Sequence, residues 1–286
     1  MQVGDYRIEI IPDTEFRLDG GAMFGVIPRN LWSWACSPDE QNRIRMNMNC
    51  LFIDTGSEKI LIETGIGEKW PANLASMYGI ERQRPFRETL LMKTGVSPEE
   101  ITIVVNTHLH FDHAGGNTIL NQKGVAVPAF ANARYFVSRA ELEHADNPSE
   151  RDRASYLAEN WKPLLASGQL EGKDADYQVM PGLRMETHPG HNRSMQCWRL
   201  DHGGKTLFGF ADLVPMRAHV SFAWIMGYDL YPIETLEAKK KLLPQAAREG
   251  WWCLFYHEPD NPLCRIVEQS QKLSAVPISP EEAELS

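Results

Sequence analysis

A short run in the middle of the chain gathers four side chains that could bind a metal ion. They are three histidines and an aspartate within six residues: His108, His110, Asp112 and His113. Imidazole nitrogens and carboxylate oxygens are the ligands that zinc and neighbouring divalent metals accept. Side chains two residues apart point the same way, whereas the adjacent side chains of Asp112 and His113 point in different directions. The spacing therefore favours two adjacent metal ions over one. The alternative is a polar loop that is rich in histidine by chance.

The residues on either side of this run indicate how it is positioned. Residues 101–105 contain four β-branched aliphatic side chains in five positions, which predicts a buried strand. Gly115 and Gly116 follow the run, as if a helix must start close beneath it. We therefore expect the four potential ligands on a loop at the end of a strand.

The run His-x-His-x-Asp-His followed by two glycines resembles the signature of the metallo-β-lactamase fold superfamily. Further matches follow in the order that the family shows: Pro189-Gly190-His191, Gly209-Phe-Ala-Asp212 and Phe255-Tyr-His257. Their spacing resembles the dinuclear branch that contains quorum-quenching N-acyl homoserine lactonases. Methyl-parathion-hydrolase-like enzymes share the pattern.

This resemblance implies a set of seven metal ligands. His108, His110 and His191 would bind the first metal ion, Asp112, His113 and His257 the second, and Asp212 would bridge the two. The implied cofactors are two divalent ions, with Zn²⁺ expected and Mn, Co or Fe as alternatives. Such ions lower the pKa of bound water to about 7, so a shared hydroxide could attack a carbonyl.

The reaction implied is hydrolysis of a lactone or ester, as in N-acyl homoserine lactonases. Asp112 and Asp212 would then be catalytic as well as metal-binding residues. The alternatives are a phosphotriesterase or arylesterase of the methyl-parathion-hydrolase type, and β-lactamase turnover as a side activity. A metal-stabilised protein without activity is the remaining alternative, and the complete ligand set argues against it.

The chain departs from the family pattern at two places. Lactonase-like relatives often have a tyrosine three residues after the bridging aspartate, where this chain has Pro215. The nearby His219 is a catalytic candidate of second rank, or else a histidine that packs a loop. The family usually has Asp-x-Gly where this chain has Glu63-Thr64-Gly65. Glu63 could orient ligand histidines, or be a plain surface residue.

Residues 20–36 form a segment with unusually large apolar side chains for a loop. In the lactonase-like branch the resembling segment lies over the metal ions as a lid. The candidate walls of an apolar substrate pocket are Met23, Phe24, Trp32 and Trp34. The alternative is a loop folded over the edge of the core.

The resemblance implies an α/β fold, the four-layer αββα sandwich, and we expect residues 1–286 to form a single hydrolase domain. The apolar fraction of 43% is enough for a substantial core. Helices are predicted over residues 68–78, 85–93, 150–166 and 233–249, with His144 on a solvated helix. The tail from Ser274 is predicted to fray.

Net charge and cysteine content indicate which partners the protein has and in which cellular compartment it works. A net charge of −9 argues against a nucleic-acid partner, because such proteins neutralise phosphates with clustered Lys and Arg. The first residues lack a basic start and a long apolar run, so we expect neither a membrane anchor nor a signal peptide. Five scattered cysteines fit reduced thiols. A cytoplasmic enzyme acting on a small-molecule lactone or ester is expected, with a homodimer left open.

Overall fold

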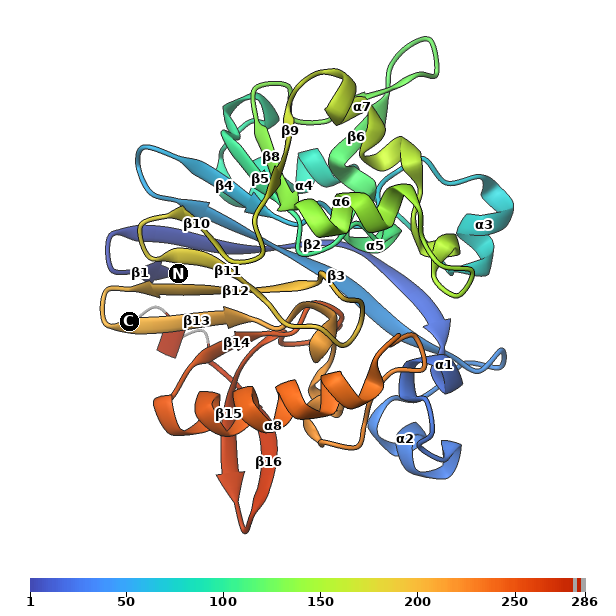
Figure 1. Ribbon diagram of the computed structural model, residues 1–286, viewed down its shortest axis with the longest axis vertical. Helices are drawn as coiled ribbons and strands as arrows, with labels where there is room; N and C mark the ends of the chain where they lie inside the picture. Colours follow the sequence, from blue (N-terminus) through green and yellow to red (C-terminus); the bar gives the residue numbers. More distant parts are fainter. Residues whose placement is uncertain (280–281, 284–286) are drawn as a thin grey trace. The chain divides into compact units, whose positions relative to one another are not determined.

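A computed structural model describes residues 1–279 and 282–283, and within them the chain forms two seven-stranded sheets (Figure 1). The strands of the first sheet, in spatial order, are β1 (Gln2–Val3), β2 (Tyr6–Asp19), β3 (Arg43–Asp54), β4 (Lys59–Ile62), β5 (Ile103–Val105), β8 (Arg134–Ser138) and β9 (Leu170–Lys173). Those of the second are β10 (Tyr177–Met180), β11 (Leu183–Thr187), β12 (Gln196–His202), β13 (Lys205–Gly209), β14 (Trp252–Leu254), β15 (Leu263–Gln269) and β16 (Lys272–Pro277). A short hairpin joins β6 (Thr118–Leu120) to β7 (Ala126–Pro128).

The chain divides into two compact units. The first comprises Met1–Thr14 and Met48–Ala175, and the second comprises Glu15–Asn47 and Asp176–Ser286. Among the described residues no helix is both long enough and apolar enough to cross a membrane.

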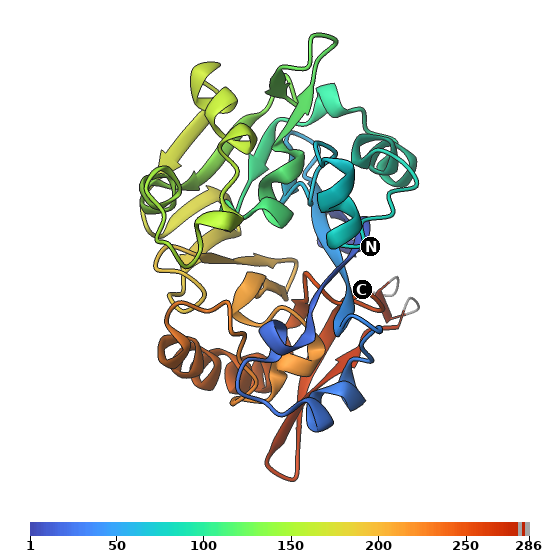
Figure 2. The same ribbon diagram turned by 90° about the vertical axis from the view of Figure 1, so that its right-hand side faces the viewer.

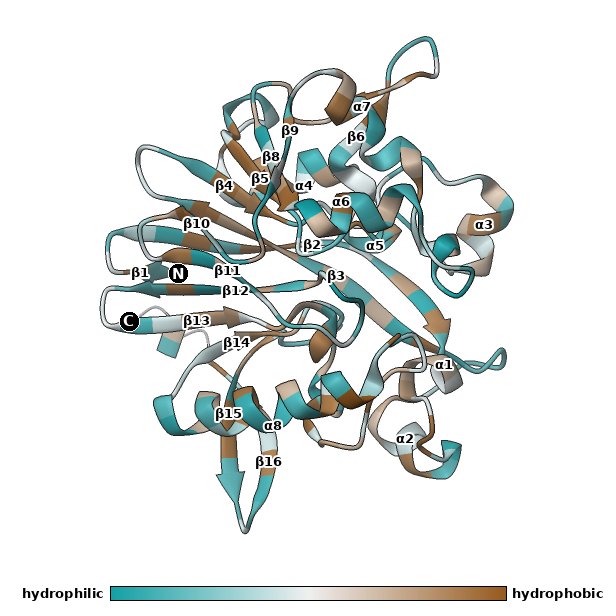
Figure 3. Cartoon of the chain, in the orientation of Figure 1, coloured by the Kyte–Doolittle hydropathy of each residue, from teal (hydrophilic) through white to brown (hydrophobic). Residues whose placement is uncertain are grey.

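The first unit is built around parallel strands. β4, β5, β8 and β9 pair in parallel, and Ile103, Val104 and Val105 of β5 are buried, which confirms the predicted strand before the histidine run. Strands that are apolar on both faces are typical of parallel sheets covered by helices, and β5 is coloured hydrophobic in Figure 3. The unit's α-helices are α3 (Ala72–Met77), α4 (Phe86–Thr94), α5 (Phe111–Ala114), α6 (Arg139–Asp146) and α7 (Lys162–Ala166).

The second unit is mainly antiparallel. β13 and β14 are its parallel pair, and the long helix α8 (Pro232–Glu249) makes the crossover between them. Pro232 suits the first turn because its missing N–H would have no partner there, and Gly250 ends the helix in the left-handed conformation. The predicted helix at this place is confirmed. Two short helices, α1 (Gly20–Phe24) and α2 (Arg29–Ala35), complete the unit.

The helix predicted over residues 150–166 is wrong. The segment instead forms two 3-10 turns, η3 (Arg153–Ser155) and η4 (Ala158–Asn160), before the short helix α7. Side-chain bonds compete with the helix here: Ser149 Oγ donates to Asp152, and Asp152 pairs with His144 Nε2 at 2.6 Å. Pro163 also lacks the backbone N–H that a helix running through this position would need, so it suits the first turn of α7 instead. His144 is accordingly partly buried and paired rather than solvated.

Three other expectations are corrected. The helix predicted from residue 68 begins only at Ala72, directly after Pro71. The segment 20–36 contains α1 and α2, and the Asp19 side chain caps α1 by accepting from Ala22 N at 2.8 Å. The tail does not fray from Ser274, because β16 pairs with β15 as far as Pro277. The remainder of that predicted tail includes residues 280–281 and 284–286, which lie outside the described residues.

Candidate metal centre

Four of the predicted ligands gather in the first unit, immediately after β5. His108 and His110 lie on the loop, and Asp112 and His113 lie in the short helix α5, which begins at Phe111. All four are buried, with exposed fractions of 0% for His108 and His113, 6% for Asp112 and 7% for His110. The His108 ring centroid lies 4.5 Å from that of His110 and 4.0 Å from that of His113. The run therefore folds into one compact cluster of donor atoms, as the sequence predicts.

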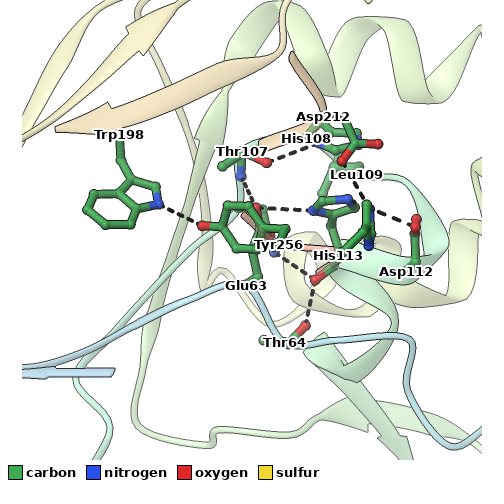
Figure 4. A network of polar contacts seen from close by, with 12 residues as sticks. Glu63, Thr64, Thr107, His108, Leu109, Asp112, His113, Trp198, Asp212 and Tyr256 are labelled. Atoms are coloured by element: carbon green, nitrogen blue, oxygen red, sulfur yellow. Dashed lines mark hydrogen bonds and ion pairs between the residues drawn. The ribbon is translucent and has the colours of Figure 1, made fainter. Parts of the chain in front are cut away.

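Glu63 lies beneath this cluster and is fully buried, so its interpretation as a surface residue is wrong. Its carboxylate accepts from the backbone N–H of Thr107 at 3.0 Å and from Asn106 Nδ2 at 3.1 Å, and lies 3.4 Å from His113 Nδ1 (Figure 4). Its φ of +66° is uncommon for a residue with a side chain. Glu63 thus ties the start of the loop to one of its histidines.

The backbone of the cluster is held from the β4 side. Thr64 Oγ1 lies 2.9 Å from Asn117 Oδ1 and 3.2 Å from the carbonyl oxygen of His113, and Asn117 Nδ2 donates to Asn106 Oδ1 at 2.9 Å. A Cβ on Gly115 would lie 2.2 Å from the carbonyl oxygen of Ile66. The glycines after the histidine run are therefore required by close backbone approach.

Sequence reasoning missed a second support, Glu141. This buried carboxylate accepts from the backbone N–H of Leu109 at 2.8 Å and from the Tyr156 hydroxyl at 3.0 Å. The Tyr156 ring meets the His110 ring edge-on, with 4.7 Å between centroids. Glu141 sits on α6, far along the chain from the cluster, and nothing in its sequence context distinguishes it from a surface helix residue.

The other three predicted ligands gather in the second unit. Asp212 Oδ2 lies 3.3 Å from His191 Nε2, and Asp212 Oδ1 lies 3.1 Å from His257 Nε2. All three residues are buried. His191 Nδ1 donates to Asp229 at 3.0 Å, and His257 Nδ1 donates to the carbonyl oxygen of Asn47 at 3.1 Å. Asp229, itself bonded by Thr235 at 2.7 Å, was not singled out from the sequence.

The donor chemistry of both groups fits divalent metal ions. Metal-binding histidines usually engage one ring nitrogen with a carboxylate, carbonyl or hydroxyl group, so that the other nitrogen faces the metal. Three of the five predicted ligand histidines show this arrangement at Nδ1, with Thr107, Asp229 and Asn47 as the outer partners of His108, His191 and His257. Nδ1 of His113 lies 3.4 Å from the Glu63 carboxylate. These His/Asp groups support metal binding by the chain.

The segment 20–36 packs within the second unit, where Figure 2 shows it in blue beside the orange segment that carries His219. Met23, Phe24 and Trp32 are buried, and the Phe24 ring stacks on both Trp32 and His219, at 5.3 and 4.8 Å between centroids. Trp34 is 90% exposed. The expected burial of this segment is therefore found for three of the four candidate pocket residues and not for Trp34.

His219 is the link between that segment and the loop after Asp212. Its Nε2 donates to the carbonyl oxygen of Met23 at 2.8 Å, and the residue is 1% exposed. Burial lowers the pKa of His219 to about 3, although the bond to Met23 acts in the opposite direction. The ring is therefore neutral at physiological pH, in the tautomer that holds Met23.

Comparison with known proteins places this geometry in a family. The family model described as metallo-beta-lactamase superfamily matches residues 45–257. The chain belongs to the metallo-β-lactamase superfamily. It therefore has the metallo-β-lactamase fold and is an enzyme of a metal-dependent hydrolase family. Two large sheets with mixed α and β content confirm the predicted α/β class.

Relatives within the superfamily include lactonases. An N-acyl homoserine lactonase of Bacillus cereus is 30% identical over 54% of this chain and 58% of its own length. N-acyl homoserine lactonase AttM of Agrobacterium fabrum is 28% identical over 58% of this chain and 61% of its own. The matches thus span somewhat more than half of these relatives.

Solved structures resemble nearly the whole chain. A probable metal-dependent hydrolase from Staphylococcus aureus has a TM-score of 0.89 and 27% identity, covering 98% of this chain and 99% of its own. AidC, a dizinc quorum-quenching lactonase with a bound product, has a TM-score of 0.79 and 20% identity, and the match covers 98% of this chain and 96% of AidC. At this identity the similarity concerns the fold alone.

Replacing Glu63 by glutamine should weaken metal binding about 10- to 100-fold. The amide keeps the size but turns two acceptor oxygens into one, so an NH₂ group must face the N–H donors of Thr107 or Asn106. Competition with a chelator measures the change. Glu58→Gln, on the same hairpin, is the control. Equal metal affinity in wild type and Glu63→Gln would contradict the role given to this carboxylate.

Replacing His219 by glutamine should remove part of the acid sensitivity of folding. Below about pH 6.5 the His219 side chain takes up a proton in the unfolded chain but not in the folded one. The contribution of the neutral ring to the free energy of unfolding is therefore complete above that pH and is lost as the pH falls toward 3. Between pH 7 and 5 the metal-free wild type should lose about 2 kcal/mol more unfolding free energy than His219→Gln. Urea titrations of both proteins measure this, and parallel losses would argue against the buried neutral ring.

Proposed function

We propose that the two groups of ligands together bind two divalent metal ions. His108, His110 and His191 bind one ion, Asp112, His113 and His257 the other, and Asp212 bridges them. The proposal makes residues 1–286 one functional domain. The observation that supports it is the hydrogen bonding of His108, His191 and His257 to outer partners at Nδ1, which leaves Nε2 for a metal.

Zn²⁺ is the ion that we propose, because tetrahedral or five-coordinate sites of histidine and carboxylate suit it. When bound, such ions lower the pKa of coordinated water to about 7 and stabilise negative charge that develops on the substrate. The buried carboxylates of Asp112 and Asp212 offset the positive charge of the ions. Glu63, Asp229 and Glu141 hold the ligands in place, so that little reorganisation is needed during the reaction.

The reaction that we propose is hydrolysis of a lactone or ester of the N-acyl homoserine lactone type. The named relatives support this class, since the B. cereus and A. fabrum proteins are N-acyl homoserine lactonases. The chain needs no serine or cysteine nucleophile for it, and four of its five cysteines are buried. Neutral His219, bonded to Met23, positions the segment 20–36 in this scheme.

A panel of substrates tests the class of reaction. The zinc-loaded protein is assayed on N-acyl homoserine lactones, aryl esters, phosphotriesters and a chromogenic cephalosporin. We expect the highest kcat/KM on a lactone. A clear preference for phosphotriesters would contradict the proposal and select the methyl-parathion-hydrolase type instead.

Asp212→Asn should lower kcat/KM by at least about a hundredfold, since loss of electrostatic stabilisation alone has effects of that size. The neutral amide cannot replace the charge that faces both His191 and His257. Asp174→Asn, at an exposed position, is the control. Retention of more than about a tenth of wild-type activity by Asp212→Asn would defeat the bridging role.

A further inference from the structure

The first of three consecutive lysines in α8 is buried. A lysine is almost never fully buried unless it is paired, yet Lys239 is 0% exposed, while its neighbour Lys240 is exposed. Lys239 Nζ donates to the carbonyl oxygens of Ser221 and Trp224, at 2.8 and 2.7 Å. Lys239 therefore fastens the helix to residues 221–227, which we call the 221–227 loop.

The surroundings of Lys239 suit a neutral amine better than an ammonium group. Burial lowers the pKa of Lys239 to about 7, although the charge of Asp229 acts in the opposite direction. A neutral amine has two N–H hydrogens, one for each of the two carbonyl oxygens. An ammonium group would bring a third hydrogen and a charge into the same buried place, which costs free energy. The neutral amine therefore holds the loop with each of its hydrogens in use.

Trp224 extends this contact to the segment 20–36. Its ring meets the Phe24 ring edge-on, at 5.5 Å between centroids. Phe24 in turn stacks on His219, at 4.8 Å between centroids. Edge-to-face and stacked rings attract each other only in particular relative positions. A shift of Trp224 would therefore disturb the place of Phe24 beside His219.

The backbones of the loop and the segment also touch. The N–H of Gly227 donates to the carbonyl oxygen of Ala22 at 2.8 Å. A Cβ on Gly25 would lie 2.7 Å from the carbonyl oxygen of Ile225, and the φ of Gly25 is +56°, so both the space and the conformation require glycine there. The start of the segment therefore rests directly on the loop that Lys239 holds.

The same face of α8 supports one of the predicted metal ligands. Thr235, one turn before Lys239, donates to Asp229 at 2.7 Å, and Asp229 accepts from His191 Nδ1 at 3.0 Å. Side chains four residues apart lie on one face of a helix. This face of α8 therefore fixes a predicted ligand through Thr235 and the segment 20–36 through Lys239.

We propose that Lys239 is a positioning residue for the substrate: it holds the 221–227 loop, and through Trp224 the segment 20–36, in the conformation that binds the substrate. The contact of this segment with a substrate rests on the proposed function, whereas the hold of Lys239 on the segment does not. Because both hydrogen bonds of Lys239 go to the loop, its loss should act on substrate binding more than on the metal ions.

The first experiment needs no turnover and measures amide hydrogen exchange of the zinc-loaded protein by mass spectrometry. Lys239→Met keeps the length of the side chain and removes the donor of two buried carbonyl groups, a loss that costs free energy. Exchange in peptides 20–27 and 221–228 should become at least about tenfold faster, and exchange in β5 should not change. Lys240→Met, at the exposed neighbouring position, is the control and should behave as wild type. Unchanged exchange in Lys239→Met, or equal acceleration throughout the chain, would overturn the proposal.

The second experiment follows the same exchange in the wild type as the pH changes. When the loop opens, the amine reaches water and its pKa returns toward 10.5, the ordinary value for lysine. Between pH 7 and 10.5 the opened form therefore binds a proton that the closed form does not, so opening increases as the pH falls. The ionisable groups that interact with Lys239 are Asp229 and His219.

Exchange in peptides 20–27 and 221–228, corrected for its intrinsic pH dependence, should rise about tenfold from about pH 8.5 to 7 and change little from about pH 7 to 6. Lys239→Met should lose this pH dependence. A corrected rate that does not depend on pH in the wild type, or the same dependence in Lys239→Met, would overturn the proposal.

The third experiment separates substrate binding from the chemical step. On an N-acyl homoserine lactone, Lys239→Met should raise KM at least about tenfold and leave kcat within about threefold of wild type, with zinc content unchanged by elemental analysis. Lys240→Met should keep both constants. Hydrolysis with an unchanged KM in Lys239→Met would overturn the positioning role and leave the proposed function standing. If the wild type hydrolyses no lactone or ester, the proposed function fails, and the exchange experiments alone decide whether Lys239 holds the segment.

Discussion

The fully buried carboxylate of Glu63 is the interaction on which the candidate site most depends. It accepts hydrogen bonds from the two residues that follow β5, Asn106 and Thr107, and lies 3.4 Å from the ring of His113, so it joins the end of the strand to the histidine run. Burying a carboxylate is costly unless hydrogen bonds compensate for lost water. The left-handed backbone of Glu63 adds strain. Both costs are concentrated where ligand geometry must be fixed.

The same principle recurs at the other predicted ligands. Asp229 and the carbonyl of Asn47 hold Nδ1 of two histidines in the second unit, and Glu141 holds the backbone between two histidines in the first. Partners of this kind fix the tautomer and the orientation of each ring before a metal ion arrives. The predicted ligands are thus held in fixed orientations, which is what the proposed hydrolytic site requires.

Local patterns made part of this arrangement predictable from sequence. The aliphatic run at β5 predicts a buried strand from a few adjacent residues, and the proline at the start and glycine at the end of α8 mark the limits of a helix. The four potential metal ligands of the histidine run lie within six residues, so they too can be recognised from the sequence. The helix predicted over residues 150–166 was wrong because the apolar spacing there is near-helical, while the hydrogen bonds of Asp152 to Ser149 and His144 favour a different backbone. Glu141 lies far along the chain from the histidine run, and only tertiary contacts bring the two together.

The central proposal is that the seven predicted ligands hold two divalent ions side by side. X-ray absorption spectroscopy at the zinc edge of the fully loaded protein tests it most directly. The account predicts a zinc–zinc distance of about 3.5 Å and a shell of mixed imidazole and carboxylate ligands. Spectra of a single isolated zinc ion, with no metal–metal scattering, would contradict it.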